Sequence, residues 1–522
     1  MAKSQADLRR AVTTWGSYSW GYADIGADIY VALGAVVGVA AGASNIVFAF
    51  AGIVYVCIGL AYTELAAAYP IAGGGCFFVT RALGDLMGFI AGWAVLLDFT
   101  IDISLFAWFT IGYVSSPKLI PWLAEPAHHN WYFACVVAVA AFLTWLNVSG
   151  VRHSSRVNEL VAAVDICAET FILACGFVLA WHPQVLIHTM QMNWPSTDDL
   201  LKGVSFAIVS FVGLESISQA AEETQRPSRI MPRTSVALIL TILIFALSYS
   251  NLVLGLPGVT DEHGTTTPLF AVLGNTQNND KAIAVLAATL PYVGSVLAYF
   301  VPMIGALLLM ISSNSGVYGA SRIAYSMGKH ELLPAWFQKV NRNTRTPVLT
   351  ILVFSGVAFI ELIAAYLQGD RAISFLLDLY AFGAALSYTL VFVALMTLRF
   401  TDTAAPRPFR MPLNVKMTIG GRHGDVSLLS VVGLLGIFSI LIFTLLTHPV
   451  GRIAGPTWVL FGIIFFAIWR SRTRRPVLGS VPRNWQTLHQ DTLASAGELE
   501  MLDEYRAALA KQKKQAATPA EM

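Results

Sequence analysis

The sequence has little charge, and its longest apolar runs contain no basic residue. Asp, Glu, Lys and Arg together make up 12% of the 522 residues, whereas hydrophobic residues make up 56%. A soluble globular domain carries about twice this fraction of charged residues. The composition therefore excludes an ordinary soluble enzyme and predicts a polytopic membrane protein.

The chain also lacks the motifs of nucleotide-binding, metal-binding and redox-active proteins. The run Gly73-Gly74-Gly75 is not part of a phosphate-binding loop, because the Lys and Ser or Thr of that motif are missing. His128 and His129 have no metal-ligand spacing, and the five cysteines form no CxxC pair. We therefore expect no enzymatic activity, no nucleic-acid partner and no cofactor, apart from H⁺, Na⁺ or K⁺ as a coupling or transported ion. Protein partners are left open.

An all-α architecture with about twelve transmembrane helices is predicted by the apolar runs. A helix needs about twenty apolar residues to cross the hydrocarbon core of a bilayer. Runs of this kind recur up to residue 470, where the composition becomes polar. The predicted helices are 17–40, 46–69, 86–115, 131–149, 157–181, 203–221, 234–256, 285–321, 347–367, 372–398, 427–447 and 454–470.

Basic residues predict the orientation of these helices. If the N-terminus is cytoplasmic, the cytoplasmic loops hold most of the Lys and Arg, for example in 226–233 and 322–345. The positive-inside rule then places both termini in the cytoplasm of a multi-pass plasma-membrane protein. In the polar tail, residues 491–514 fit an amphipathic helix. A frayed or surface-lying tail and a regulatory arm are the two interpretations of this segment.

Three acid pairs at i, i+4 spacing lie inside apolar segments that have no Lys or Arg. Each acid at the centre of a membrane helix costs about 2.5–3.5 kcal/mol on insertion scales. Because no basic side chain is present in these spans, protonation, water in a cavity or a bound cation must relieve this cost. The pairs therefore indicate a transport site. They are Asp24 with Asp28, Asp98 with Asp102, and Asp165 with Glu169.

Three segments, in order along the chain, carry a resemblance to a known family. Residues 62–81 read YTELAAAYPIAGGGCFFVTR, residues 211–233 read FVGLESISQAAEETQRPSRIMPR, and residues 319–334 read GASRIAYSMGKHELLP. They resemble, respectively, three parts of the amino acid–polyamine–organocation permeases. These parts are the second helix with the segment after it, the sixth helix with its loop, and the signature after the eighth helix. The resemblance covers about residues 15–470 and does not reach a substrate.

The resemblance implies two inverted five-helix repeats, helices 1–5 and 6–10, followed by two peripheral helices. In such folds the first helix of each repeat breaks near mid-membrane, and the freed backbone groups bind substrate and ion. Gly26 and Gly213 are the expected breaks, and Glu215 follows the second; glycine as a packing notch is the alternative for both. The implied parts are a cytoplasmic lead (1–16), a transport core of two repeats (17–398), a loop with helices 11 and 12 (399–470) and a cytoplasmic tail (471–522).

Two departures from the family pattern favour a cationic substrate and an acidic coupling site. Asp28 stands where the family has a glycine that lets backbone N–H groups approach a substrate carboxylate, which an aspartate would repel. The alternative is that Asp28 caps a half-helix. Asp165 stands where proton-coupled relatives carry a lysine, with Ser312, Ser313 and Asn314 as the facing oxygen ligands. The alternative is that the two hydroxyls bond to their own backbone.

Asp98 and Asp102 share a helix face, and Trp93 and Trp108 are near them in sequence. An acidic pocket lined by aromatic rings suits an organic ammonium ion, although the tryptophans could equally pack against lipid. The predicted substrate-binding residues are Asp24, Gly26, Asp28, Asp98, Asp102, Gly213 and Glu215. The predicted ion-coupling residues are Asp165, Glu169, Ser312, Ser313 and Asn314.

These features predict a secondary active transporter for an amino acid or amine, with a cationic substrate favoured and H⁺ or Na⁺ as the coupling ion. The expected partners are this small molecule or cation and the lipid bilayer. Two alternatives stay open. The first is a K⁺ importer, because Leu96-Leu97-Asp98-Phe99 is similar to a stretch of the potassium-importing branch. The second is a non-transporting membrane sensor.

Overall fold

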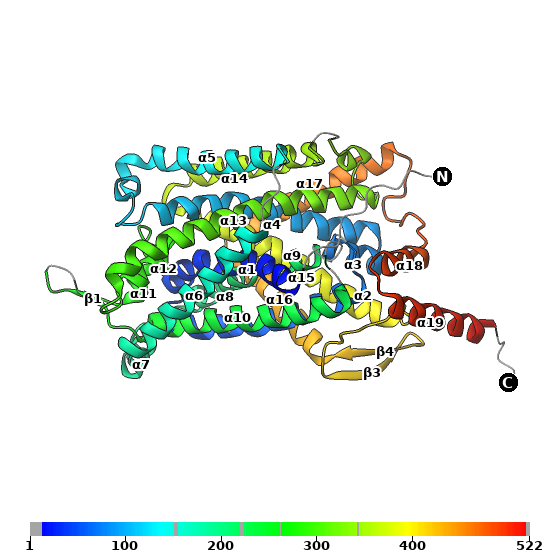
Figure 1. The fold of residues 1–522 in the computed structure, drawn as a ribbon, viewed down its shortest axis with the longest axis horizontal. Helices are drawn as coiled ribbons and strands as arrows, with labels where there is room; N and C mark the ends of the chain where they lie inside the picture. The colour runs from blue at the N-terminus through cyan, green and yellow to red at the C-terminus, as the bar shows by residue number, and fades with distance from the viewer. Residues whose placement is uncertain are drawn as a thin grey trace.

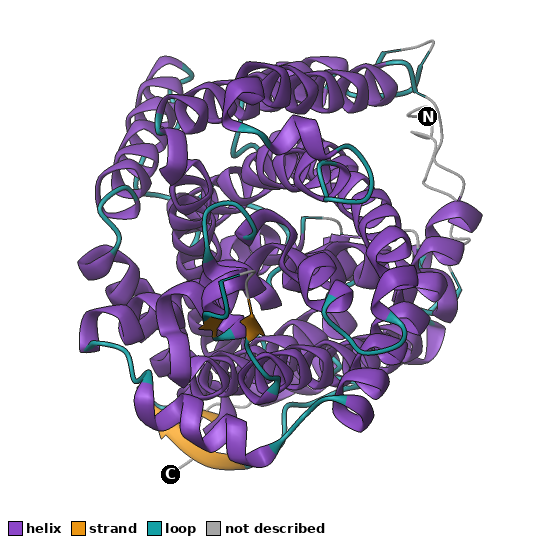
Figure 2. Ribbon diagram, turned by 90° about the vertical axis from the view of Figure 1, so that its left-hand side faces the viewer, coloured by secondary structure: helices purple, strands orange, loops and turns teal. Residues whose placement is uncertain are grey.

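The computed structural model describes residues 13–71, 73–150, 155–219, 224, 226–260, 263–341 and 344–517. Most of the predicted N-terminal lead, and parts of the loops at 151–154 and 220–225, lie outside these residues. The described chain is almost entirely helical, and most of its long helices run along one axis (Figure 1). Viewed from the end that carries α7, the helices form a bundle (Figure 2).

The first repeat ends with α6, and a short helix α7 follows it. A 3₁₀ turn, Ala41–Ala43, separates α1 from α2, and α3 is a short helix between α2 and α4. Two further 3₁₀ turns, Pro121–Ala124 and Pro126–His128, precede α5. The helices are α1 (Thr14–Ala40), α2 (Ser44–Ala68), α3 (Gly74–Leu83), α4 (Asp85–Val114), α5 (His129–Val148), α6 (Ser155–Leu179) and α7 (Pro183–Met192).

The second repeat begins with an interrupted helix. The 3₁₀ turn Ile208–Phe211 continues α8, and α9 starts after two non-helical residues. A two-residue antiparallel hairpin, β1 (Val259–Thr260) with β2 (Thr266–Thr267), precedes α11. The helices are α8 (Thr197–Ala207), α9 (Leu214–Gln219), α10 (Pro227–Gly255), α11 (Leu269–Gly274), α12 (Ala282–Ala288), α13 (Gly294–Lys329), α14 (Val348–Leu367) and α15 (Ala372–Thr401).

The remaining elements are a hairpin, two long helices and the tail. Strands β3 (Asn414–Ile419) and β4 (Arg422–Ser427) pair antiparallel, with Asn414 opposite Ser427. They lie at the same end of the molecule as the tail (Figure 1). The long helices are α16 (Leu428–Thr447) and α17 (Gly451–Arg472), and the tail helices are α18 (Trp485–Ser495) and α19 (Leu499–Ala517).

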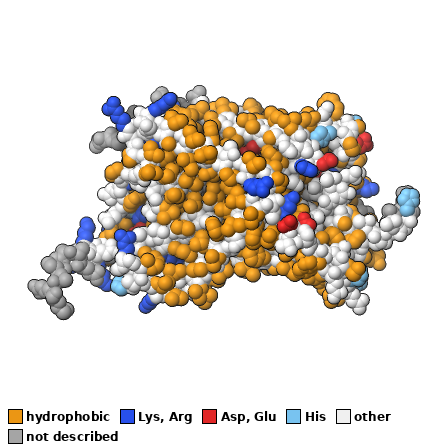
Figure 3. Space-filling view, turned by 180° about the vertical axis from the view of Figure 1, so that it is seen from behind, with side chains coloured by type: hydrophobic (Ala, Val, Ile, Leu, Met, Phe, Trp, Pro, Cys, Tyr) orange, Lys and Arg blue, Asp and Glu red, His pale blue; other side chains and the backbone are white. Residues whose placement is uncertain are grey.

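Corresponding helices of the two repeats pack against each other. α1 contacts α8, the 3₁₀ turn and α9, whereas α2 contacts α10, α4 contacts α13, and α5 contacts α14. These pairs are the first with the sixth, second with the seventh, third with the eighth and fourth with the ninth predicted helix. This pairwise packing is the arrangement that two inverted repeats produce. Hydrophobic side chains cover much of the surface between the two ends (Figure 3).

The predicted number of spans is confirmed. Ten stretches of the described chain are long and apolar enough to cross a membrane. One of them, Thr14–Ala68, contains both α1 and α2, so that the ten stretches hold eleven helices. The interrupted helix α8–α9 is not among them and corresponds to the remaining predicted span. The predicted span 285–321 began and ended too early, because a turn separates α12 from α13 and α13 continues to Lys329.

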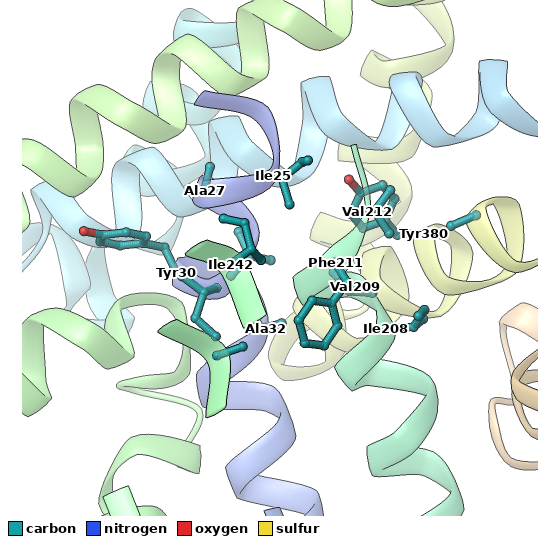
Figure 4. Close-up of a cluster of buried hydrophobic side chains, with 14 of the residues drawn as sticks. Ile25, Ala27, Tyr30, Ala32, Ile208, Val209, Phe211, Val212, Ile242 and Tyr380 are labelled. Carbon is teal, nitrogen blue, oxygen red and sulfur yellow. The ribbon is translucent and has the colours of Figure 1, made fainter. Parts of the chain in front are cut away.

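Gly213 interrupts the sixth helix as predicted. Val212 is extended and Gly213 has a φ of +105°, a conformation that only glycine adopts without strain. A Cβ atom at this position would lie 2.9 Å from Ile25 Cγ1 and 3.2 Å from Asp24 Oδ2. Gly213 therefore allows both the break and the close approach of α9 to α1. Ile25, Phe211 and Val212 pack together at this point (Figure 4).

The predicted break at Gly26 is wrong, because α1 is helical from Thr14 to Ala40. A Cβ atom on Gly26 would lie 3.0–3.1 Å from three carbons of the Tyr22 ring. Glycine thus leaves room for the ring that lies over it, which is the packing alternative. Asp28 consequently stands in mid-helix, and its alternative role as the cap of a half-helix is also wrong.

The C-terminal tail lies against the core and is not frayed over its described residues. Trp485 packs on Phe77 of α3, with ring centroids 5.7 Å apart. Arg483 forms an ion pair with Asp85, and the Glu498 carboxylate accepts hydrogen bonds from the Ser228 N–H (3.0 Å) and hydroxyl (2.6 Å). The predicted single helix 491–514 is two helices, α18 and α19. The tail thereby joins α3, α4 and α10.

Candidate substrate and ion site

Five carboxyl groups from three elements meet in the interior. Their electrostatic interactions link each acid to at least two of the others. None is more than 4% exposed. We call this set the central carboxyl cluster: Asp24 and Asp28 on α1, Asp98 and Asp102 on α4, and Glu215 on α9.

One side of the cluster is formed by Asp98 and Glu215. Their carboxyl groups are within hydrogen-bonding reach of each other. The Tyr388 hydroxyl of α15 donates to Glu215 Oε2 at 2.7 Å and accepts from the Gly213 N–H at 3.3 Å. The interruption of the sixth helix therefore has a direct role, because it places Glu215 beside α4 and frees a backbone donor for Tyr388.

The other side is formed by Asp24, Asp28 and Asp102. The hydroxyl of Ser315 on α13 donates to Asp24 Oδ1. The Tyr380 hydroxyl of α15 donates to Asp28 Oδ1 over a long 3.5 Å and is also within reach of Asp102. Tyrosine hydroxyls thus line both sides of the cluster.

The described part of the protein does not neutralise the negative charge that the five acids would carry if they were ionised. No ion pair with Lys, Arg or His is recorded for any of the five acids among the described residues. Isolated carboxylates are too costly to bury, so protons or a cation must compensate them. Four of their oxygens are buried without a hydrogen-bond partner: Asp24 Oδ2, Asp28 Oδ2, Asp98 Oδ1 and Asp102 Oδ1.

The acids of the cluster do not form a ligand set for a metal ion. Within the described ranges, no three His, Cys, Asp or Glu side chains are arranged to hold a metal ion. The oxygens available to a ligand come from carboxyl and hydroxyl groups. This arrangement suits an extended cation with hydrogen-bond donors, and it also offers the hard oxygen ligands that alkali cations prefer.

Asp165 and Glu169 of α6 form a second acid site, with different partners. The Tyr30 hydroxyl donates to Asp165 Oδ1 at 2.7 Å, and the Tyr22 hydroxyl, with its one hydrogen, lies 2.8 Å from Asp165 Oδ2 and 3.1 Å from Glu169 Oε2. Both acids are fully buried, and Glu169 Oε1 has no hydrogen-bond partner. We call these two acids the α6 acid pair.

The predicted ion ligands on the eighth helix do not act as one set. The Ser312 hydroxyl donates to the Asp24 carbonyl at 3.4 Å, and the Ser313 hydroxyl donates to the Ile103 carbonyl at 3.0 Å. Asn314 Oδ1 accepts from Asn147 Nδ2 at 2.8 Å. These contacts join α13 to α1, α4 and α5, whereas the recorded hydrogen-bond donors to Asp165 are two tyrosines. The role of the three residues in ion coupling stays a prediction.

Of the two interpretations left open for the tryptophans, lining of the acidic pocket does not hold. Trp93 stacks on Trp458 of α17 at 4.7 Å, and Trp108 lies 5.6 Å from the Tyr132 ring of α5. The reason is helical geometry: five positions separate Trp93 from Asp98, which corresponds to about 140° around the helix axis. The tryptophans therefore join α4 to its outer neighbours, and tyrosines line the cluster.

Sequence reasoning missed Tyr380, Tyr388, Ser315 and Glu361. The two tyrosines are eight positions apart on α15 and so share a face, but an apolar helix with tyrosines gives no signal of its own. Glu361 is a single acid within the apolar α14. We searched the apolar segments for pairs of acids only. A search for single acids in the same segments would have identified Glu361.

The family model described as amino acid permease matches residues 13–468. The chain therefore belongs to this family. It is a membrane transport protein and not an enzyme, in agreement with the prediction, and the expected relationship to the amino acid–polyamine–organocation permeases is confirmed.

Curated relatives of this permease family share about a quarter of their residues with the chain. The branched-chain amino acid permease BcaP of Bacillus subtilis is 25% identical over 402 residues, covering 74% of this chain and 80% of its own. The vacuolar cationic amino acid transporter 4 of Arabidopsis thaliana is also 25% identical, covering 72% of this chain. The chain spans 61% of the length of that plant relative.

A solved structure confirms the fold alone. The manganese transporter of Eremococcus coleocola superposes with a TM-score of 0.53 and 12% identity, covering 89% of this chain and 98% of its own.

Proposed function

We propose that this permease is a secondary active transporter that carries a cationic amino acid or amine through the central carboxyl cluster, coupled to H⁺ or Na⁺. The observation that carries the proposal is the set of five buried carboxyls without a basic partner in the described chain. A substrate ammonium supplies the missing positive charge and the N–H donors for the unpartnered oxygens. Cationic amino acid transporters among the relatives are consistent with this substrate class.

The unbroken α1 argues against a substrate carboxylate at this position. In a continuous helix the backbone N–H groups are bonded to carbonyls one turn earlier and are not available to a ligand. Asp28 occupies the same stretch and would repel an anion. A substrate with a carboxylate would therefore need a different donor group, and an amine without one fits the cluster better.

The coupling ion in this proposal binds at the α6 acid pair. The acid pair is buried and separate from the central carboxyl cluster, and its two tyrosine donors stabilise a carboxylate that can bind a proton or Na⁺. The positive-inside distribution supports the accompanying proposal that the protein lies in the plasma membrane with both termini in the cytoplasm. K⁺ as the transported ion is the second candidate, because the cluster offers only oxygen ligands.

Flux and binding measurements with the purified full-length chain test this function. We expect L-arginine, L-lysine or 1,4-diaminobutane to raise the thermal stability of the wild type and to enter proteoliposomes along an imposed ion gradient. Asp98→Asn removes one carboxylate and should weaken binding roughly 10- to 100-fold, the equivalent of about 1.5–3 kcal/mol for a charge-assisted bond.

The matched control is Glu125→Gln, which removes a carboxylate that is exposed on the loop between α4 and α5. It should leave binding and flux unchanged. Stabilisation and flux with K⁺ alone would identify the inorganic candidate. Ligand stabilisation without any flux would indicate a sensor and contradict the transport proposal.

A further inference from the structure

Glu361 is a buried carboxyl that belongs to neither acid site. It is the one charged residue of α14 and is 6% exposed. Thr100 Oγ1 of α4 lies 2.8 Å from its Oε1, and Ser104 Oγ of α4 lies 3.1 Å from its Oε2. No ion pair with a basic side chain is recorded for it in the described chain. An ionised, unpaired carboxylate at this depth is costly.

Counting the hydrogens around Glu361 favours a bound proton. Thr100 Oγ1 is also 2.8 Å from the Leu97 carbonyl, and Ser104 Oγ is within 3.1–3.2 Å of the Ile101 and Thr100 carbonyls. Each hydroxyl has one hydrogen, and in membrane helices it commonly goes to such a carbonyl. A neutral Glu361 brings a third hydrogen, so that one more of these contacts becomes a hydrogen bond.

α4 separates Glu361 from the central carboxyl cluster. Thr100 and Ser104 are two positions before and after Asp102, and therefore lie on the opposite side of α4 from Asp98 and Asp102. Glu361 acts electrostatically on Asp102 across the helix. Helices α5, α13 and α15 also pack near α14. The charged side chains among their described residues have no electrostatic interaction with Glu361.

One helix width therefore separates Glu361 from Asp102. One elementary charge at about 10 Å, the width of a helix, moves a titration midpoint by about one pH unit at an effective dielectric constant of 20. A cluster carboxylate that carries no proton repels an ionised Glu361, and a cation that binds to this carboxylate removes the repulsion.

We propose that Glu361 is a proton-binding site of the transport cycle. It holds a proton while the central carboxyl cluster lacks its cation. When the cation binds, the Glu361 O–H bond breaks, the proton passes to a water molecule, and Glu361 keeps the electron pair as a carboxylate. The proton returns when the cation leaves. This inference rests on the proposed binding of a cation in the cluster, and it adds a proton to the ion bound at the α6 acid pair.

Proton release on ligand binding tests the assignment. The full-length chain in weakly buffered detergent solution is mixed with L-lysine, 1,4-diaminobutane or KCl, and a pH-sensitive dye reports the protons released per chain. We expect the wild type and Glu125→Gln to release protons equally with a probe that stabilises them. Glu361→Gln keeps its hydrogen-bonding capacity, should bind the same probe and should release fewer protons, with the difference largest at the titration midpoint of Glu361. Equal release by Glu361→Gln and wild type would overturn the proposal.

Infrared spectroscopy separates this inference from the proposed function. If no probe binds to the wild type, the proposed function fails, and the proton on Glu361 is still measurable. A protonated-carboxyl band at neutral pH that Glu361→Gln removes supports the proton site, and identical spectra contradict it. If Glu361→Gln does not fold, Thr100→Val removes one hydrogen-bond partner and should move the pH at which the band disappears; an unmoved band counts against the site.

Discussion

Protonation of His489 should release the C-terminal tail in mildly acidic solution. The His489 ring is fully buried between the rings of Tyr69, 5.1 Å away, and Tyr505, 4.6 Å away. Burial, and to a lesser extent the positive charge of Arg81, lower the pKa of His489 from 6.5 to about 4 against a smaller opposing effect of Asp402. The docked tail therefore favours the neutral imidazole.

The magnitude follows from the two pKa values. In a released tail the imidazole is exposed and titrates near 6.5. Above this pH both states are neutral and docking does not depend on pH through His489. As the pH falls below 6.5, the released state gains a proton and docking loses about 1.4 kcal/mol for each pH unit, until the docked pKa near 4 is reached. The loss is about 1.4 kcal/mol at pH 5.5 and about 3 kcal/mol at pH 4.

A spin label on the tail measures this equilibrium. Gln512 bonds to Thr403 at 3.0 Å in the docked tail, so that a nitroxide on Gln512→Cys, in a background without accessible native cysteines, reports release as increased mobility. We expect constant mobility above pH 6.5 and increasing mobility below it. His489→Phe keeps an aromatic ring without a titratable group and should remove the dependence. The same pH dependence in this variant, or none in the wild type, would refute the reasoning.

Three further substitutions have defined expectations. Gly213→Ala forces a Cβ to within 2.9 Å of Ile25 at a positive φ, and should lower the unfolding free energy by about 1–3 kcal/mol in thermal denaturation; an unchanged melting temperature would contradict the assigned close packing. Tyr388→Phe leaves the Gly213 N–H and Glu215 Oε2 without this partner, at a cost of about 1–3 kcal/mol in the same assay, whereas Tyr292→Phe on the exposed surface should have no effect. Asp165→Asn should keep substrate binding but abolish gradient-driven accumulation in proteoliposomes, and undiminished accumulation would disprove the coupling role.

The helices and the acid residues were predictable because both signals are local. A membrane span is defined by about twenty successive apolar residues, and an acid inside it is visible without knowing the fold. Gly213 was predictable through the family motif around it. Gly26 was not, because a glycine below a ring such as that of Tyr22 looks the same in sequence as a glycine at a break.

The partners of each acid were not predictable because they come from distant segments. Tyr388 reaches Glu215 across 173 positions, and Tyr30 reaches Asp165 across 135. Residue type was also misleading. A tryptophan near an acid in sequence suggested a pocket, but the position of Trp93 around the axis of α4 directs its ring to α17. The docked tail was missed for the same reason, since its anchor Asp85 stands at the start of a membrane helix and its arginine partner Arg483 lies in the polar segment.

The two acid sites share α1, and this connection gives the proposed coupling a structural route. Tyr22, Gly26 and Tyr30 recur every four residues on one face, whereas Asp24 and Asp28 are displaced by two positions and lie on the opposite face. Tyr30 and Tyr380 accordingly lie on opposite sides of α1 in Figure 4. The tyrosine face bonds to the α6 acid pair and the acid face belongs to the central carboxyl cluster. Because α1 is a continuous helix, a shift that accompanies ion binding on one face must move the carboxyls on the other. An ion at Asp165 and a cation at Asp28 would then favour particular positions of the same helix, which is the differential binding that coupled transport requires.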